Sequence, residues 1–174
     1  GTEPYFIDQA VHHFEKEILN DAEKEFNLTV CYGRDSLMEN ILSSARRYPM
    51  MAEKQVIIVK EAQDLPDWKR MEEVESFGKY VTKPVDSTIL VFAFKHKKPD
   101  GRLKAMQQVK KSGAMFEFNA YKDYQLPGWI SDYVKQKGYN IEQNASLLLA
   151  EYLGTDLKKM VNELEKMMIT LPEG

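Results

Sequence analysis

Two short stretches of this sequence contain residue types that nucleotide hydrolases place around phosphate. Such enzymes need a glycine-rich loop followed by Lys and Ser or Thr at a helix start, which hold phosphate and magnesium. Gly1-Thr2-Glu3 opens the first expected helix, but no Lys-Thr pair follows it. The strongest expected strand, 56–59, continues into Lys60-Glu61-Ala62, where acids that bind magnesium are required. Intrinsic ATP hydrolysis is therefore not expected.

Other catalytic and metal-binding arrangements also lack a required partner. His12, His13 and His96 have no Cys, Asp or Glu at metal-ligand spacing, so we expect no metal site and no cofactor. Ser43-Ser44 lacks the context of a nucleophile elbow. No expected strand ends in the aspartate that a phospho-receiver domain needs. The sequence thus predicts no catalytic residues.

Length and composition are those of an ordinary globular protein. With 174 residues, 43 % hydrophobic and 29 % charged, the chain suits one domain, or one domain with a small satellite. The net charge of −3 does not indicate a nucleic-acid-binding surface over the whole protein. A single cysteine, Cys31, excludes an internal disulfide and fits a reducing compartment. No apolar stretch has the length of a membrane span, and no signal peptide is recognisable.

Strands and helices alternate in the pattern up to about residue 120, which predicts an α/β domain with a parallel sheet. The apolar run 56–59 is continuous, as expected for a strand covered on both faces. Ser36 and Glu39 have the spacing of a capping box for the helix that Pro49 stops. The other expected strands are 28–32, 88–94 and 115–118, and the other expected helices are 4–24, 68–81 and a short one over 103–109.

Only helices are expected after residue 120. They cover 124–137, 141–153 and a third stretch from Thr155, and Gly138 and Gly154 stand where a helix C-terminus favours glycine. The predicted fold class is therefore α/β, a parallel sheet with flanking helices followed by a small three-helix lid domain. The predicted domains are 1–120 and 121–174. The abrupt opening at Gly1 suggests that an upstream strand is missing.

Several stretches, in order along nearly the whole chain, resemble one known family. They are Gly1-Thr2-Glu3-Pro4-Tyr5, the segment 45–56, Asp100-Gly101-Arg102-Leu103-Lys104, Gly154-Thr155-Asp156-Leu157 and 162–167. The family that they resemble is the delta subunit of the bacterial DNA polymerase III clamp loader. Its first motif is a degenerate relic of a phosphate loop, so the resemblance also implies a degenerate AAA+-like α/β domain.

The resemblance implies a non-enzymatic role within the DNA polymerase III holoenzyme in the cytoplasm. Delta subunits bind the ring-shaped sliding clamp and help to open it, whereas ATP is used at other subunits. The expected partners are the sliding clamp, other clamp-loader subunits through a C-terminal collar domain that is absent here, and DNA only within the complex. No membrane contact and no cofactor are implied.

By the resemblance, Met50 and Met51 are the two apolar residues that plug a pocket in the clamp. The pair departs from the family pattern, in which one member is usually bulky or aromatic, although flexible methionine suits an apolar groove. The residues themselves agree, because an apolar pair after Pro49 and before a charged pair is typical of an exposed connection. The alternative is that both side chains fold back onto the sheet. The expected rim of the contact is Tyr48, Gln55 and Arg47.

A basic segment is the second candidate site. Its cations could contact DNA phosphates, or they could form a solvated loop and helix face. Aromatic stacking partners are missing among them, which favours the solvated face. The candidate nucleic-acid residues are Lys97, Lys98, Arg102 and Lys104.

Two other functions stay open at this stage. One is an AAA+ ATPase with an atypical nucleotide site, which tight magnesium-dependent ATP binding would indicate. The other is an α/β interaction module unrelated to replication, which failure to capture the sliding clamp would indicate.

Overall fold

The computed structural model describes residues 1–170 and divides the chain into two compact units, one formed by 1–118 and one beginning at 119. The first contains the sheet and the second contains helices only. The expected domain division at 120/121 remains a prediction, because contacts define compact units and not independently folding domains.

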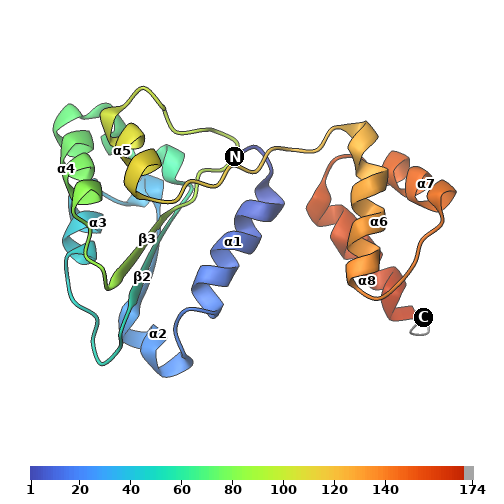
Figure 1. Cartoon of the computed structure of the whole chain (residues 1–174), viewed down its shortest axis with the longest axis horizontal. Helices are drawn as coiled ribbons and strands as arrows, with labels where there is room; N and C mark the ends of the chain where they lie inside the picture. Colours follow the sequence, from blue (N-terminus) through green and yellow to red (C-terminus); the bar gives the residue numbers. More distant parts are fainter. Residues whose placement is uncertain (171–174) are drawn as a thin grey trace. The chain divides into compact units, whose positions relative to one another are not determined.

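The first unit is built on a three-stranded parallel sheet with the strand order β1-β2-β3 (Figure 1). Its strands are β1 (Leu28–Tyr32), β2 (Gln55–Lys60) and β3 (Thr88–Phe92). Parallel strands need a crossover between them, and helices supply it here. The predicted α/β fold with a parallel sheet and flanking helices is confirmed.

The central strand β2 divides the core into two layers. The helices around it are α1 (Pro4–Lys16), α3 (Met38–Ala45), α4 (Met71–Thr82) and α5 (Lys104–Ser112). Val56 and Ile58 pack with α1, whereas Ile57 and Val59 pack with α3, α4 and α5. Figure 1 shows α1 on one face of the sheet and the other three helices on the opposite face. Successive side chains of a strand point to opposite faces, so the continuous apolar run fills both layers.

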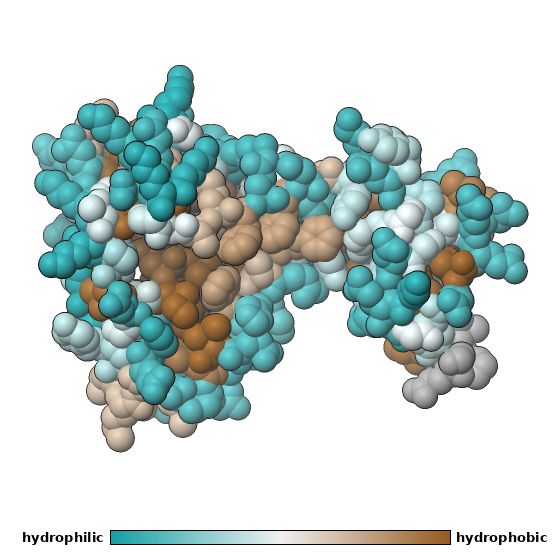
Figure 2. All heavy atoms as spheres, in the orientation of Figure 1, coloured by the Kyte–Doolittle hydropathy of each residue, from teal (hydrophilic) through white to brown (hydrophobic). Residues whose placement is uncertain are grey.

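The edge of the sheet formed by β3 is only half-buried. All five residues of β3 have intermediate exposure, and Figure 2 shows apolar side chains gathered over the strands between α5 and α1. The predicted strand 115–118 is wrong, because that segment has no regular structure. Its last carbonyl, that of Phe118, instead accepts hydrogen bonds from the amides of Thr2 and Glu3 at the start of α1.

The predicted helix 4–24 is also wrong as one element. α1 ends at Lys16, and a separate helix, α2 (Asp21–Asn27), follows. Asn20 caps α2: its side chain accepts from the Glu23 amide at 2.9 Å, and the Glu23 carboxylate accepts from the Asn20 amide at 3.0 Å. Such a reciprocal pair begins a helix, and an Asn followed three residues later by Glu was the overlooked signal.

The predicted capping box of Ser36 and Glu39 does not form. The Ser36 hydroxyl donates to the Tyr32 carbonyl instead, and α3 begins at Met38 without a cap from its own segment. The buried carboxylate of Asp67 takes that role and accepts from the Met38 amide at 2.6 Å. A second Asp67 oxygen lies 3.5 Å from the guanidinium of Arg70. A residue distant in sequence therefore satisfies the helix start.

Two other boundaries move by a few residues. β3 stops at Phe92, before the predicted end at 94, and α4 begins at Met71 because a separate 3₁₀ turn precedes it. The 3₁₀ turns of this unit are η1 (Gly33–Asp35), η2 (Ala62–Asp64) and η3 (Pro66–Lys69).

The second unit contains the three predicted helices. They are α6 (Leu126–Gln136), α7 (Gln143–Leu153) and α8 (Leu157–Thr170), preceded by the 3₁₀ turn η4 (Asp123–Gln125). Ile130, Leu157 and Met160 are among the buried side chains that hold them together. Gly138 and Gly154 have φ values of 86° and 69°, so glycine does terminate α6 and α7 in the left-handed region.

We predict that Asp67→Ala lowers the free energy of unfolding by about 1–3 kcal/mol, because it leaves the Met38 amide without its buried acceptor. Chemical denaturation followed by circular dichroism measures this change. The control is Asp64→Ala, which removes an exposed carboxylate nearby and should change stability by no more than about 0.5 kcal/mol. Equal effects of the two substitutions would contradict the capping role.

Candidate protein-binding site

The parallel register of the strands places the segments that precede them at one end of the sheet, the end where the strands begin. Leu28 lies opposite Val56, and Gln55 lies opposite Thr88. Residues 46–54, here called the methionine loop, lead into β2 and therefore lie at this end of the sheet. The C-terminus of α2, which leads into β1, lies at the same end. Open α/β sheets bind small ligands at the opposite end, beyond the carboxyl ends of their strands. The position of the methionine loop thus suits a contact with another macromolecule.

The methionine loop presents large apolar side chains to water. Met50 is 61 % exposed, Met51 is fully exposed and Tyr48 is 82 % exposed. Neither methionine folds back onto the sheet, so both are available for contact, as expected from the sequence. Met51 also has a φ of 52°, a left-handed conformation that residues other than glycine seldom adopt.

A buried asparagine holds the middle of the methionine loop. The Asn27 carboxamide accepts from the Met50 amide at 2.6 Å and donates to the Met50 carbonyl at 2.9 Å. The same amide nitrogen donates to the Glu23 carbonyl in α2 at 3.0 Å. Asn27 itself is 3 % exposed, and its bonds fix the backbone beside the two exposed methionines.

Gln55 supports the loop from inside and is not part of its rim. Its side-chain nitrogen donates to the carbonyls of Arg47 and Ser44 and to the Thr88 hydroxyl. With 9 % exposure, the Gln55 side chain cannot reach a partner on the surface. This corrects its predicted role, because a polar residue at the start of a buried strand was taken as exposed. Arg47 is exposed, as a rim residue must be.

Two residues near the loop were missed in the sequence. Asn27 has no local signature, because its partner Met50 is 23 positions away. Phe26, in α2 beside Asn27, is 63 % exposed and adds an aromatic ring to the surface of this region. A phenylalanine within the mostly polar stretch 21–27 was the available signal for it.

The structure does not gather the four predicted nucleic-acid residues into one open cationic patch. Lys98 forms a short ion pair with Glu117, and Arg102 is paired with a carboxylate in its own loop. Lys97 and Lys104 are exposed and form no ion pair among residues 1–170. Half of the predicted cations are therefore already neutralised by the protein itself.

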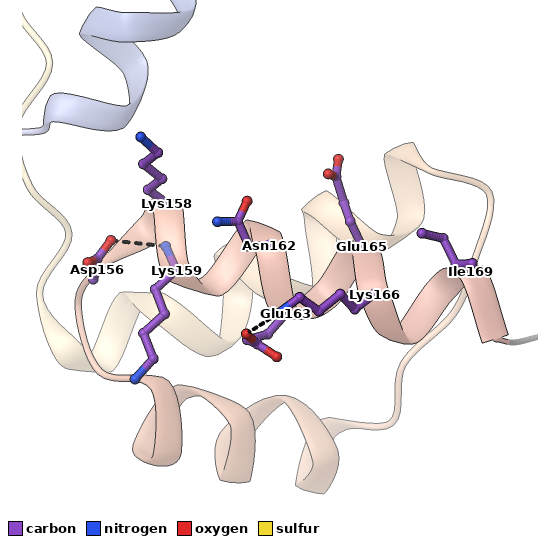
Figure 3. Close-up of a pocket in the computed structure, with 8 residues that line it drawn as sticks. All are labelled: Asp156, Lys158, Lys159, Asn162, Glu163, Glu165, Lys166 and Ile169. Atoms are coloured by element: carbon purple, nitrogen blue, oxygen red, sulfur yellow. Dashed lines mark hydrogen bonds and ion pairs between the residues drawn. The ribbon is translucent and has the colours of Figure 1, made fainter.

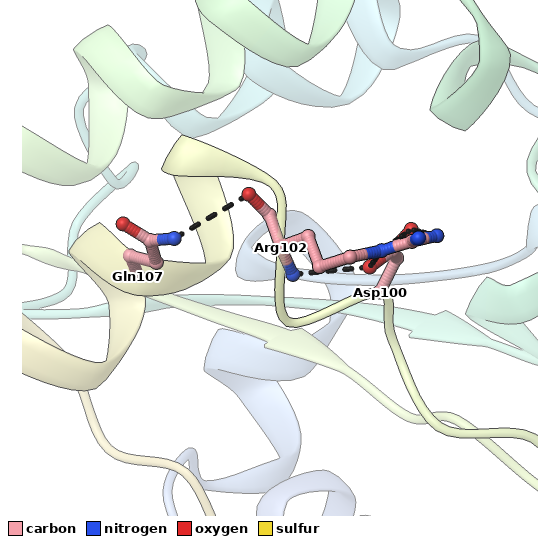
Figure 4. A network of polar contacts seen from close by, with 3 residues as sticks. All are labelled: Asp100, Arg102 and Gln107. Carbon is pink, nitrogen blue, oxygen red and sulfur yellow. Dashed lines mark hydrogen bonds and ion pairs between the residues drawn. The ribbon is translucent and has the colours of Figure 1, made fainter.

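Asp100 and Arg102 form the most regular of these pairs (Figure 4). The guanidinium donates to both carboxylate oxygens at 2.8–3.3 Å, and the Arg102 amide donates to the same carboxylate at 3.0 Å. These side-chain and backbone hydrogen bonds lower the pKa of Asp100 to about 2. Gln107 completes the network by donating to the Arg102 carbonyl at 3.4 Å. The network orders the loop that leads into α5.

At the carboxyl end of the strands, where a nucleotide site would lie, the protein forms internal ion pairs. Lys60, at the end of β2, is 2.6 Å from Glu15 of α1. Lys95, after β3, is 2.5 Å from Asp8 of the same helix. No cluster of three residues suited to holding a metal occurs in the described part of the chain. These cations are occupied by the protein's own carboxylates.

The start of α1 is likewise occupied by acceptors. Phe118 accepts from the amides of Thr2 and Glu3, and the Glu3 carboxylate accepts from the Tyr5 amide at 3.0 Å. A helix N-terminus binds phosphate through free amides and a positive dipole end. Here a carboxylate stands at that position, and it would repel a phosphate group.

The second unit has a shallow hollow of about 500 Å³ along α8 (Figure 3). Its lining combines both charges, and Lys166 is paired with Glu163 at 2.8 Å. Ile169 is the one apolar residue among those that line it. Without aromatic rings or a convergent set of donors, the hollow does not indicate a defined ligand.

No helix within residues 1–170 is long and apolar enough to cross a membrane.

Comparison with known proteins decides the family. A family model described as "DNA polymerase III, delta subunit" matches residues 1–119. The chain belongs to the DNA polymerase III delta subunit family. Membership confirms the resemblance inferred from the motifs.

The chain is similar to delta from Bacillus subtilis both in sequence and in structure. The DNA polymerase III subunit delta is 23 % identical over 171 residues, which are 96 % of this chain and 49 % of that protein. The structure of the DNA clamp loader delta protein YqeN aligns with a TM-score of 0.78 and 23 % identity, over 99 % of this chain and 53 % of that one. The chain spans about half the length of these relatives, and the structural match shows the shared delta fold.

A RuvB mutant structure from Thermotoga maritima aligns over 83 % of the chain with a TM-score of 0.46 and 16 % identity. A likeness at this level adds nothing to the assignment. The AAA+-like character of the α/β unit therefore remains a prediction.

We predict that Asp100 titrates near pH 2 and that Arg102→Ala raises its pKa toward the ordinary value of about 3.9. Because the folded pKa lies below the unfolded one, the pair stabilises the fold above pH ~4 and loses this effect as the pH falls toward 2. Carboxyl NMR titration measures the shift. Lys104→Ala is the control and should leave the pKa unchanged, whereas an unchanged value in Arg102→Ala would contradict the assigned cause.

Proposed function

We propose that this chain is the part of a delta subunit that binds the sliding clamp and helps to hold one interface of the ring open during DNA replication. The observation that carries the proposal is a fully exposed Met51 beside an exposed Met50, on a loop whose backbone is fixed, in a member of the delta family. The proposed setting is the bacterial cytoplasm, within a clamp loader that contains further subunits.

The physical argument starts from the apolar area that the methionine loop leaves in water. Burying an apolar side chain of this size is worth about 1.5–3 kcal/mol. Two adjacent methionines can enter one apolar pocket, and their flexible thioethers adapt to its shape. Tyr48 and Arg47 beside them are of the types enriched in protein interfaces. The loop thus has an apolar centre and a rim that can form polar contacts.

We further propose that the chain does not hydrolyse ATP and that ATP bound at other subunits drives clamp opening. Support comes from the start of α1, where the Glu3 carboxylate and the Phe118 carbonyl take the amides that a phosphate would need. The cations Lys60 and Lys95 are engaged by Glu15 and Asp8. A nucleotide would have to break these contacts before it could bind.

DNA contact is proposed only within the assembled complex. Lys97 and Lys104 are the predicted residues that keep exposed charges without an ion pair among residues 1–170. Two cations can neutralise few phosphates, and non-specific DNA affinity scales with that number. The isolated chain is therefore not proposed to be a DNA-binding protein.

We predict that Met50→Ala combined with Met51→Ala weakens binding to the sliding clamp roughly 30- to 1,000-fold. This range corresponds to a loss of about 2–4 kcal/mol, because the two variants remove most of the buried apolar area of the contact. Titration of the clamp from the same organism, by calorimetry or surface-immobilised binding, gives the dissociation constants.

The matched control is Met71→Ala combined with Met115→Ala, which removes two exposed methionines of the same unit outside the methionine loop. Clamp affinity should stay within about twofold in this control, as expected for residues outside the contact. An unchanged affinity in the first variant, with its fold intact by circular dichroism, would defeat the proposed site.

We predict that calorimetry with ATP and magnesium detects no binding tighter than about 1 mM, which corresponds to only about 4 kcal/mol. The reason is that the donors and cations of a nucleotide site are already paired inside the protein. Titration with ADP and with ATP lacking magnesium provides the comparison. A micromolar dissociation constant that depends on magnesium would instead support an ATPase with an atypical site.

A further inference from the structure

The middle of the methionine loop has few contacts of its own. Between Tyr48 and Glu53, the hydrogen bonds within the described residues are the two between Met50 and Asn27. The neighbouring bonds lie outside that stretch: Gln55 holds the Arg47 carbonyl, and the Lys54 ammonium donates to the Asp86 carbonyl at 2.8 Å. Asn27 is therefore the group that fixes the backbone where the methionines project.

The two bonds to Asn27 need both functions of a carboxamide. The oxygen accepts from the Met50 amide, and the nitrogen donates to the Met50 carbonyl and to the Glu23 carbonyl. A carboxylate of the same size has acceptors only, and a hydroxyl cannot span both backbone groups. Asn27 is the last residue of α2, so its two bonds to Met50 connect the loop to that helix, which begins with its own capping box, and the bond to Glu23 orients the Asn27 side chain within α2. The loop is thus tied to a rigid element.

Met51 shows why such a fixed point matters. Its φ of 52° is unfavourable for a residue with a β-carbon, and its fully exposed side chain gains nothing from packing. Nothing in the side chain of Met51 therefore favours this backbone conformation. The restraint on the preceding residue, Met50, has to supply it.

We propose that Asn27 is a positioning residue that presets Met50 and Met51 for docking into the sliding clamp. This inference rests on the proposed function of the methionine loop. A contact loop that is already ordered in the free protein loses less conformational entropy when it binds. Asn27 itself is buried, so it acts through the loop and does not touch the partner.

The test is Asn27→Asp, which keeps the size of the side chain but removes the donors and places a carboxylate against two carbonyl oxygens. We expect clamp affinity to fall roughly 5- to 15-fold, as for the loss of about one buried hydrogen bond. The matched control is Asn20→Asp, seven residues earlier, where aspartate caps α2 as well as asparagine does. Its affinity should not change.

A double-mutant cycle separates positioning from a general effect on the fold. In the Met50→Ala, Met51→Ala background, Asn27→Asp should cause no further loss of affinity, because the groups that it positions are gone. An equal fold-loss in both backgrounds would overturn the proposal. An unchanged clamp affinity of the single variant Asn27→Asp, which keeps both methionines, would also overturn it.

Hydrogen exchange of the free protein provides a readout that does not need the clamp. We expect the Met50 amide to exchange at least tenfold faster in Asn27→Ala, which removes the oxygen that accepts from this amide, while the amides of Ile57 and Ile58 in β2 stay protected and show that the sheet is folded. Unchanged protection of Met50 would overturn the positioning role. If Asn27→Asp fails to fold, Asn27→Ser, which adds no charge, serves for the same measurements.

The two proposals fail in different ways. If the methionine variants bind the clamp normally, the proposed function falls, and the exchange of the Met50 amide still decides whether Asn27 orders the loop. If the methionine variants lose binding and Asn27→Asp does not, only the positioning role falls.

Discussion

Burial of β2 on both faces is the constraint on which the rest of the first unit depends. Four consecutive apolar residues, 56–59, fill the two core layers, so the strand has only one place in the sheet. Parallel pairing on both sides then fixes where every neighbouring segment begins and ends. The methionine loop lies at the end of the sheet where the strands begin, because it leads directly into β2. Tyr48, Met50 and Met51 in this loop remain exposed to water.

A surface that is to be both apolar and ordered needs buried polar support. At the methionine loop the apolar side chains of Met50 and Met51 point outward and the polar ones of Asn27 and Gln55 point inward, the reverse of the usual arrangement. Asn27 and Gln55 are buried and form hydrogen bonds with the backbone of the loop, while the side chains of Met50 and Met51 remain in water. This division of roles explains how a loop without packing of its own keeps one shape.

The sequence predicted what depends on local pattern. Continuous or periodic apolar runs located β1, β2 and most helices, and glycine located the ends of α6 and α7, because these signals lie within a few residues. The exposure of Met50 and Met51 followed from Pro49 and the charged pair after them. What failed depends on distant partners. Ser36 was expected to cap a helix that Asp67 caps, and Gln55 was placed on a rim although Thr88 and Arg47 hold it inside. The strand expected at 115–118 also failed: the segment has no regular structure, and its Phe118 carbonyl bonds to the distant start of α1.

The cap that Asp67 provides for α3 has a consequence for how the methionine loop can be studied and imitated. α3 has eight residues, and isolated helices of that length are marginal in water. Its first-turn acceptor comes from 29 positions further along the chain, beyond β2, so α3 and the rest of the unit form cooperatively. A synthetic peptide that covers α3 and the loop would contain both methionines but neither Asp67 nor Asn27. It would carry the chemistry of the contact without its shape, which only the folded unit confers.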